Sequence, residues 1–389
     1  MKKTLILLSI GLVALASCAK QEGVEFNLTN APAWVSNEEL PVPIEFGGGI
    51  STMAVTKGTA LSGEAFAAST YKYDILAAKS DGTAMPGFEN GLLVSNQTHT
   101  IQGGDDDGED ILTVNFGGSR FYPYLSTGGN AYNFYGYGID GTHHAVANGM
   151  VTGIVIGNND IIWAKSEPDA AKLAALSDAI GKEVPDGFNA RYMRAAYKAS
   201  LDGENLNETL YYSYLPKLTF AHITSQIQFL VRAEDEYAAN SLSNGGVRVQ
   251  SITVKSISLA ATLNVTTGAL AGGNVGNLAV SGIPAQGVLP QYVVEESVPV
   301  AAECGEPVFI LPVDDISLDI VISMPEGSPN TTETITLTDI VPKVGGTATT
   351  FQAGKKYNMT IVFQSIEEIK VVTELLPWDE LDVDDIILE

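Results

Sequence analysis

The stretch LTFAHITSQIQFLV, residues 218–231, decides the fold class of this chain. Its apolar residues alternate with polar ones, which is the pattern of a β-strand with one buried face. Leu218 and Phe220 hold even positions, whereas odd positions are held by Ile223, Ile227, Phe229 and Val231. Because one extra residue in a strand turns every later side chain to the opposite face, we predict a bulge or bend near residues 221–222.

The same period of two recurs along the rest of the chain. Apolar and polar residues alternate over 334–338 and, apart from Val362, over 357–363, and residues 252–259 repeat the change of parity. Glycine and proline contribute 39 and 17 of the 389 residues, a composition that favours many short strands joined by turns. The body of the chain is therefore predicted to be all-β.

One helical insertion interrupts the strands. Ser166 is the expected N-cap of a helix over Ala170–Ile180, and Gly181 offers a stop. A second helical run spans Asn189–Lys198. The predicted fold class is all-β with a helical insertion, in two β-sandwich domains. The polar stretch 200–208 is the expected boundary, which gives an N-terminal domain over 18–205, with the insertion near 166–198, and a C-terminal domain over 206–389.

The N-terminus has the features of an export signal. Lys2 and Lys3 precede an apolar stretch, residues 4–15, that is too short to span a bilayer. The run Leu-Ala-Ser-Cys at 15–18 resembles a bacterial lipobox, so residues 1–17 are predicted to be a lipoprotein signal peptide and Cys18 the lipidated residue that receives palmitate. A plain secretory signal with an incidental cysteine is the alternative. The expected location is the cell surface, as an outer-membrane lipoprotein anchored by lipid.

Charge and cysteine content exclude several classes of function. Acidic residues outnumber basic ones by 46 to 21, for a formal net charge of -25. Without a basic footprint, the chain is not expected to bind nucleic acid or to grip anionic membranes by charge. Cys304 is the second of two cysteines, so no intrachain disulfide is expected once Cys18 carries lipid. Its acidic neighbours raise the thiol pKa, which favours a structural role.

Motifs that carry chemistry are weak here. Gly136, Gly138 and Gly141 match the dinucleotide fingerprint G-x-G-x-x-G, but no helix follows, so they are predicted to serve strand ends and turns. The acidic run at 105–110 lacks EF-hand spacing and is expected to be a solvated turn rather than a calcium site. Four histidines have no metal-ligand spacing. We therefore predict no catalytic residue, cofactor or metal, and no enzyme activity.

An aromatic cluster lies between residues 121 and 137. Aromatic side chains can stack on sugar rings at a surface, but they also dominate β-sheet cores, and core packing is the predicted use. The cluster consists of Phe121, Tyr122, Tyr124, Tyr132, Phe134, Tyr135 and Tyr137.

These features together resemble the fimbrillin family, the lipoprotein pilin precursors of Bacteroidia type V pili. The matching stretches, in order, are residues 132–137, 160–164, 218–227 and 351–357, followed by Trp378. The resemblance implies two transthyretin-like β-sandwich domains and export as a lipoprotein. It also implies trimming by a trypsin-like protease in the loop after the first strand. A strand from the next subunit would then fill the groove that the lost strand leaves.

Candidate parts for this assembly are present. The first strand would be Val42–Phe46 and the next Ser51–Thr56, with cleavage at Lys57, where family members often carry arginine. The donor strand would lie in 374–389, although this tail equally fits a strand that completes its own domain. Its apolar residues are Leu375, Leu376, Leu381, Val383, Ile386 and Leu388.

The predicted function is a structural or tip subunit of a cell-surface fimbria that supports adhesion. Its partners would be other pilin subunits and the outer membrane through the lipid anchor. The alternative is a monomeric, lipid-anchored surface protein that binds a glycan or host ligand through its aromatic residues. The two readings differ in whether the N-terminus is trimmed and whether subunits interlock.

Overall fold

The computed structural model describes thirteen stretches of the chain: residues 26–46, 50–52, 72–97, 100–102, 111–113, 119–123, 130–181, 183–184, 187–295, 298–323, 331–344, 347–365 and 369–376. Two compact units form from these residues. The first is built from Met1–Gly47, Arg120–Ala131 and Glu167–Pro216, and the second from Gly48–Ser119, Tyr132–Ser166 and Lys217–Glu389. Among the described residues, no helix is both long enough and apolar enough to cross a bilayer.

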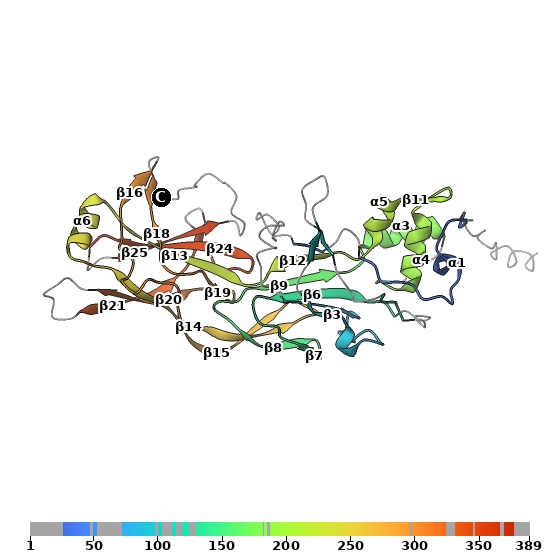
Figure 1. Ribbon diagram of the computed structural model, residues 1–389, viewed down its shortest axis with the longest axis horizontal. Helices are drawn as coiled ribbons and strands as arrows, with labels where there is room; N and C mark the ends of the chain where they lie inside the picture. The colour runs from blue at the N-terminus through green and yellow to red at the C-terminus, as the bar shows by residue number, and fades with distance from the viewer. Residues whose placement is uncertain are drawn as a thin grey trace, which may run out of the picture. The chain divides into compact units, whose positions relative to one another are not determined.

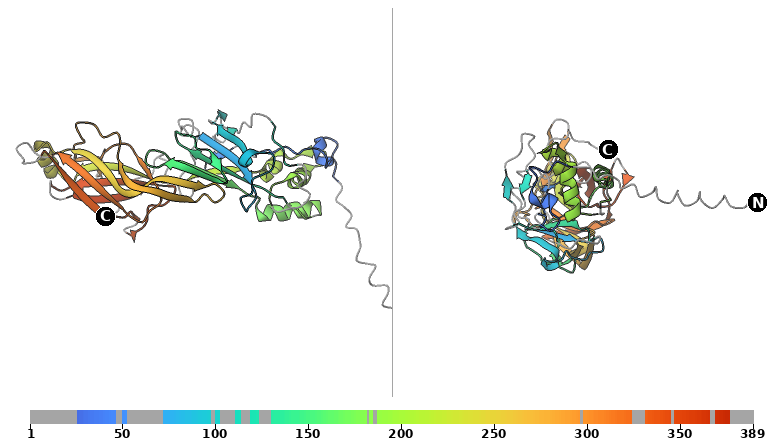
Figure 2. Two further views of the ribbon diagram at one scale, coloured as in Figure 1. Left: turned by 90° about the horizontal axis from the view of Figure 1, so that it is seen from below. Right: turned by 90° about the vertical axis from the view of Figure 1, so that its right-hand side faces the viewer.

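The first unit is the helical insertion together with the N-terminal segment. Its helices lie close to one another in both views (Figures 1 and 2). They are α1 (Ala33–Ser36), α3 (Ala170–Ile180), α4 (Ala190–Ala199) and α5 (Glu208–Tyr214), with a small hairpin of β10 (Leu201–Asp202) and β11 (Asn205–Leu206). Both predicted helices are confirmed, whereas the hairpin falls in the stretch taken as a boundary and α5 begins at its last residue.

Helix α3 begins one turn later than its predicted cap. Asp169 is the N-cap, and its carboxylate accepts hydrogen bonds from the backbone N–H groups of Ala171 (2.8 Å) and Lys172 (3.1 Å). The Ser166 cap was wrong, because Ser166 ends strand β9 (Ile161–Ser166) and its hydroxyl accepts from Lys217 N at 2.9 Å. Gly181 ends the helix in the left-handed region at φ 64°, as the sequence predicted.

The second unit consists of β-sheets. The eight-stranded sheet has the order β3-β2-β6-β9-β12-β1-β5-β4. Its strands are β3 (Leu92–Gln97), β2 (Lys72–Ala78), β6 (Asn133–Ile139), β9 (Ile161–Ser166), β12 (Leu218–His222), β1 (Ile50–Thr52), β5 (Ile111–Thr113) and β4 (Thr100–Gln102), with a 3-10 turn at Glu89–Gly91.

Two further large sheets complete this unit. The six-stranded sheet contains β21 (Thr332–Ile340), β20 (Ile316–Ser323), β14 (Val249–Asn264), β8 (Met150–Val155), β7 (Val146–Ala147) and β15 (Leu270–Ala279), which pairs with β14. The five-stranded sheet contains β18 (Ala302–Glu303), β13 (Ser225–Ala233), β24 (Lys355–Phe363), β25 (Ile369–Leu376) and β19 (Val308–Ile310). Smaller elements are α6 (Glu236–Asn244), β16 (Val293–Glu295) with β17 (Val298–Val300), and β22 (Lys343–Val344) with β23 (Thr347–Ala348).

The long strand β14 contributes residues to both hydrophobic cores. Its first half pairs with β20 and packs, through residues such as Ile252 and Val254, against the buried side of β13 and β24. Its second half pairs with β8 and packs, through Leu263, against the aromatic side chains of β6. The chain therefore forms two sandwich cores that share one sheet, and the prediction of an all-β fold with a helical insertion is confirmed.

The change of parity at 218–231 is confirmed, but its cause differs from the prediction. Strand β12 ends at His222 and β13 begins at Ser225, so residues 223–224 carry the chain from the eight-stranded to the five-stranded sheet. In β14 the predicted irregularity is a true bulge, with a register shift between Val254 and Ile257. The predicted division into domains near residue 205 stays a prediction.

Two glycines of the false dinucleotide fingerprint lie inside β6, not at its ends. All seven residues of β6 are buried, so both faces of this strand are covered. A Cβ atom on Gly136 would lie 2.5 Å from Cζ of Phe220, and one on Gly138 would lie 2.9 Å from Cγ1 of Ile162. The prediction of strand-end glycines is thus wrong for these two and right for Gly141, which turns the chain at φ 79°.

Candidate functional site

The structure reaches only part of the predicted site. Cys18, Lys57 and the acidic run at 105–110 lie outside the described residues. So do four of the six apolar donor-strand residues, namely Leu381, Val383, Ile386 and Leu388. What the structure describes is the chain on either side of these positions: the N-terminal segment 26–46, strand β1, and the final strand β25.

Strand β25 carries the first two donor-strand candidates. It runs antiparallel to β24, with Leu375 opposite Tyr357 and Leu376 opposite Lys356. Leu375 is half-buried and packs against the core of the second sandwich. The start of the predicted donor segment therefore extends its own sheet, and a donor role for the residues beyond 376 stays a prediction.

Strand β1 lies inside the eight-stranded sheet although it precedes Lys57 in the chain. Ile50 pairs in parallel with Leu218 of β12 and antiparallel with Leu112 of β5. The strand expected at Val42–Phe46 is wrong, because within that range one isolated bridge forms, between Pro43 and Phe121. Because β1 lies between two partner strands, its removal would leave unpaired backbone groups on both β12 and β5.

One arginine of the helical insertion makes several hydrogen bonds to the N-terminal segment 26–46. Arg194 of α4 donates from Nε to the carbonyl oxygen of Trp34 at 2.8 Å, and from one terminal nitrogen to the carbonyls of residues 37, 38 and 40 at 3.4, 3.2 and 2.9 Å. Burial lowers the pKa of the guanidinium. Val35, Val42 and Ile44 are buried beside these contacts. Sequence reasoning missed this clamp, because a lone arginine in a helix gives no signal of its partners.

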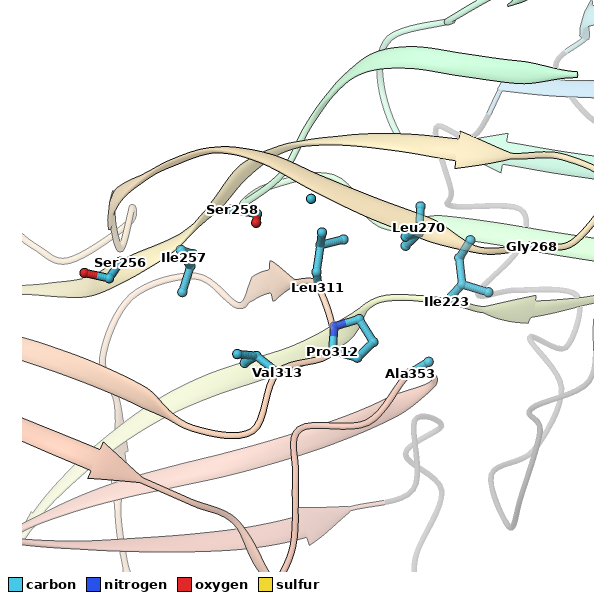
Figure 3. A pocket seen from close by; sticks show the side chains of 11 residues that line it. Ile223, Ser256, Ile257, Ser258, Gly268, Leu270, Leu311, Pro312, Val313 and Ala353 are labelled. Atoms are coloured by element: carbon cyan, nitrogen blue, oxygen red, sulfur yellow. The ribbon is translucent and has the colours of Figure 1, made fainter. Parts of the chain in front are cut away.

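An apolar hollow of about 420 Å³ lies where the chain crosses between the sandwiches (Figure 3). Ile223 of the crossover, Leu270 at the start of β15 and the segment 311–313 after β19 line it, together with residues of the β14 bulge. Strand β15, which borders the hollow, pairs only with β14 among the described strands. A hollow beside a free strand edge is a place where an added strand gains both hydrogen bonds and apolar contacts.

Two carboxylates, Asp74 and Asp160, are buried, and their partners were not predicted from the sequence. Asp74 is fully buried and accepts hydrogen bonds from Tyr137 Oη (2.5 Å) and Asn96 N (2.7 Å), with His143 Nε2 at 2.9 Å. Burial, then the charge of Asp74, raises the pKa of Tyr137. With two donors bonded to it and His143 in contact, Asp74 is a structural acceptor that joins β2, β3 and β6.

The second carboxylate sits at the crossover between the sandwiches. Asp160 is buried, its Oδ1 accepts from the Thr224 hydroxyl, and its Oδ2 contacts His222 Nδ1. These contacts fix residues 222–224, where β12 gives way to β13. Among the described residues, no group of three His, Cys, Asp or Glu side chains is placed to bind a metal.

Cys304 and the aromatic cluster are parts of the core. Cys304 is fully buried, and burial raises the pKa of its thiol to about 12, so the predicted direction is right although the cause is burial and not the acidic neighbours. Five of the seven cluster aromatics are at most 2 % exposed, which confirms core packing for them; Phe121 is 41 % exposed and Tyr124 lies outside the described residues.

Fold and site together define a β-sandwich protein with a helical insertion. Strand β1 lies inside the eight-stranded sheet, and strand β25 lies at one end of the five-stranded sheet. Residues 205–378 match the model of the fimbrillin-like family. The fimbrillin resemblance predicted from the sequence is thereby confirmed over this region, which runs from β11 to just beyond β25.

Solved structures with a similar course of the chain come from Bacteroidia. A candidate cell adhesion protein from Bacteroides uniformis is 15% identical, with a TM-score of 0.43 over 87% of this chain and 98% of that one. A fimbrial assembly protein from Parabacteroides distasonis is 11% identical (TM-score 0.38; 86% and 96% covered), and the fimbrial anchor protein Mfa2 from Porphyromonas gingivalis is 8% identical (TM-score 0.35; 87% and 98% covered). No curated protein matches the sequence.

Proposed function

We propose that this chain is a structural or tip subunit of a cell-surface fimbria. The match of residues 205–378 to the fimbrillin-like family carries the proposal. In this proposal the chain is exported as a lipoprotein acylated at Cys18 and reaches the outer membrane. It then joins other pilin subunits by donor-strand exchange and supports adhesion.

The position of β1 supports trimming as the trigger for assembly. Cleavage after Lys57 separates β1 from the rest of the chain, and β1 lies between β12 and β5. Its loss leaves the edge of β12 unpaired at residues 218–220, which pair with β1 in the intact chain. A strand from another subunit then has a backbone edge to extend, and until cleavage the chain covers that edge itself.

The donor in this proposal is the end of the chain beyond β25. Residues 377–389 contain the four remaining predicted donor residues, Leu381, Val383, Ile386 and Leu388, among acidic residues. Because β25 remains paired with β24, this tail can leave the subunit without removing a strand from the second core.

The first experiment determines the N-terminus of the native protein, by mass spectrometry of material taken from the cell surface. A start at Gly58 is the expected result, and acylated Cys18 in assembled polymers contradicts trimming. Lys57→Gln should block polymer formation, whereas Lys57→Arg, which keeps a site for a trypsin-like protease, should not. Equal polymerisation of the two variants would contradict the assignment of Lys57 as the cleavage site.

A deletion tests the donor separately. Removal of residues 377–389 leaves β24 and β25 intact, so the monomer should fold with unchanged circular dichroism. The trimmed protein should then fail to form polymers detectable as ladders on electrophoresis without boiling. Polymers of normal length from this deletion exclude the tail as donor and leave the family assignment standing.

A further inference from the structure

The first unit contains an aromatic hollow that the proposed assembly does not use. Its volume is about 430 Å³, within the range of small-ligand sites. The N-terminal segment contributes Trp34, Glu45 and Phe46, and the helical insertion contributes Tyr197, Tyr211 and Tyr212. All of these residues belong to the same compact unit.

The rings of this hollow form walls that meet at steep angles. Trp34 and Tyr197 pack edge to face, with ring centres 5.6 Å apart and planes at 78°. Tyr197 and Tyr211 do the same at 5.4 Å and 68°. Tyr212 adds a third wall next to Tyr211 and is 47 % exposed, so the hollow is open to solvent on that side. Steeply angled rings do not make the single flat platform on which a sugar ring stacks, but they surround a compact group from several sides.

One carboxylate faces this aromatic lining. Tyr211 Oη donates to Oε2 of Glu45 at 2.9 Å, and no described residue donates a hydrogen bond to the other carboxylate oxygen or forms an ion pair with Glu45. The nearby cation, Arg194, is committed to backbone carbonyls of residues 34–40. Burial first, and then the charge of Glu45, raises the pKa of both Tyr197 and Tyr211. Among the described residues that line the hollow, Glu45 is the one with a charged side chain.

We propose that this hollow binds an organic cation, an alkylammonium group held against the faces of Trp34, Tyr197, Tyr211 and Tyr212 with its charge balanced by Glu45. Aromatic faces attract cations through the negative region above each ring, and this attraction grows when the cation is shielded from water. The Glu45 carboxylate, which accepts from Tyr211 Oη and forms no ion pair with a described residue, adds a charge of the required sign inside the same hollow.

The site requires two parts of the chain that lie far apart in sequence. Trp34 and Glu45 precede Lys57, whereas the tyrosines follow it. The hollow is complete only while segment 26–46 stays docked on the helical insertion. Cation binding is therefore a property of the chain with its N-terminal segment in place, and its measurement does not depend on whether the protein polymerises.

The test is calorimetric titration of the untrimmed chain, residues 18–389, with choline and with 3,3-dimethylbutan-1-ol, the neutral molecule of the same shape. We expect choline to bind and the neutral isostere to bind roughly tenfold more weakly or not at all. n-Butylammonium, which reproduces the end of a lysine side chain, distinguishes a primary ammonium source from a quaternary one.

Variants locate the binding. Glu45→Gln keeps the size of the side chain and Tyr212→Ala removes a half-exposed ring, and each should weaken choline binding by roughly tenfold. Tyr237→Ala, which removes an 84 % exposed ring from α6 in the other unit, should leave it unchanged. Equal binding of choline and its isostere, binding that survives Glu45→Gln in a folded protein, or binding of N-acetylglucosamine instead overturns the proposal. No heat from either cation at millimolar concentration overturns it as well.

Discussion

At the residue scale, the glycines of β6 show how a side chain's absence shapes this core. Gly136 and Gly138 leave room for the ring of Phe220 and the side chain of Ile162, which lie across the strand. Phe220 is 1 % exposed, so its ring is enclosed in the core. A motif that mimics a nucleotide-binding loop is therefore explained by side-chain packing on the faces of one sheet.

We expect Gly136→Ala to destabilise the protein by about 1–3 kcal/mol, the usual cost of overpacking a dense core. Gly273→Ala is the matched control, because Gly273 lies in β15 with no heavy atom within 4 Å of the added Cβ. This control should be neutral or stabilising by up to about 1 kcal/mol. Urea denaturation of both variants measures the difference, and equal midpoints would refute the packing argument.

The buried tyrosines make stability depend on alkaline pH. Burial raises the pKa of Tyr122, Tyr137, Tyr192 and Tyr211 above the usual value near 10. In the unfolded chain these groups lose their protons near pH 10, while the folded chain still holds them. Because the unfolded state then binds fewer protons, stability is complete below about pH 10 and falls as the pH rises further.

The expected result is a urea midpoint that is constant from pH 7 to 9 and lower at pH 10.5. Absorbance at 295 nm, which reports tyrosinate, should show these four side chains ionising only as the protein unfolds. The chain has fifteen tyrosines. If all of them ionised in the native state at pH 10.5, the result would contradict the burial of the hydroxyl groups of these four.

At the scale of single elements, helix α3 illustrates how strongly its ends depend on particular side chains. Asp169 satisfies two backbone N–H groups that otherwise have no partner inside the helix. Gly181 supplies the left-handed residue at the other end. The helix carries only one fully buried side chain, Leu176, so its ends contribute much of what fixes it in place.

Asp169→Ala should lower the stability of the helical insertion by about 1 kcal/mol, the typical value for the loss of an N-cap. Asp178→Ala is the comparison: this exposed residue near the C-terminus of the same helix opposes the helix dipole, so its removal should be neutral or slightly stabilising. Hydrogen exchange of amides in Ala170–Ile180 measures both effects. Faster exchange in the Asp178 variant than in the Asp169 variant would reject the cap.

At the scale of the whole molecule, the N-terminal segment and the helical insertion depend on each other. Arg194 contacts carbonyl oxygens about 160 residues earlier in the chain, and buried Val42 and Ile44 pair by backbone hydrogen bonds with residues 120–122. Under the proposed function, cleavage at Lys57 alone leaves these contacts intact. Dissociation of the segment is then a separate step that Arg194 opposes.

Arg194→Gln should therefore speed the release of the cleaved segment, because four carbonyl contacts are lost at a cost of about 1–3 kcal/mol. Arg191→Gln, an exposed arginine one turn earlier in α4, is the matched control and should have no effect. Protein cleaved with a lysine-specific protease is passed through a sizing column, and mass spectrometry measures how much of peptide 21–57, which contains segment 26–46, remains bound. Equal retention in both variants would show that Arg194 does not hold the segment.

The sequence by itself determined the class of the elements and much of their burial. Alternation at 357–363 predicted a half-buried strand, the change of parity at 218–231 predicted an irregularity where the chain changes sheets, and the helix over Ala170–Ile180 has the predicted bounds. These features are local, because hydrophobic period and end signals are encoded within about ten neighbouring residues.

Only the tertiary structure decided which distant residues meet. Phe220 over Gly136, Thr224 on Asp160, Arg194 on residues 34–40 and Glu45 beside Tyr211 each join positions separated by roughly 60 to 170 residues. Each of these partners is an ordinary residue in its own neighbourhood, so no local pattern distinguishes it. The clamp on the N-terminal segment and the aromatic hollow exist because packing of separate elements brings such residues within contact distance, and that distance is set by the fold as a whole.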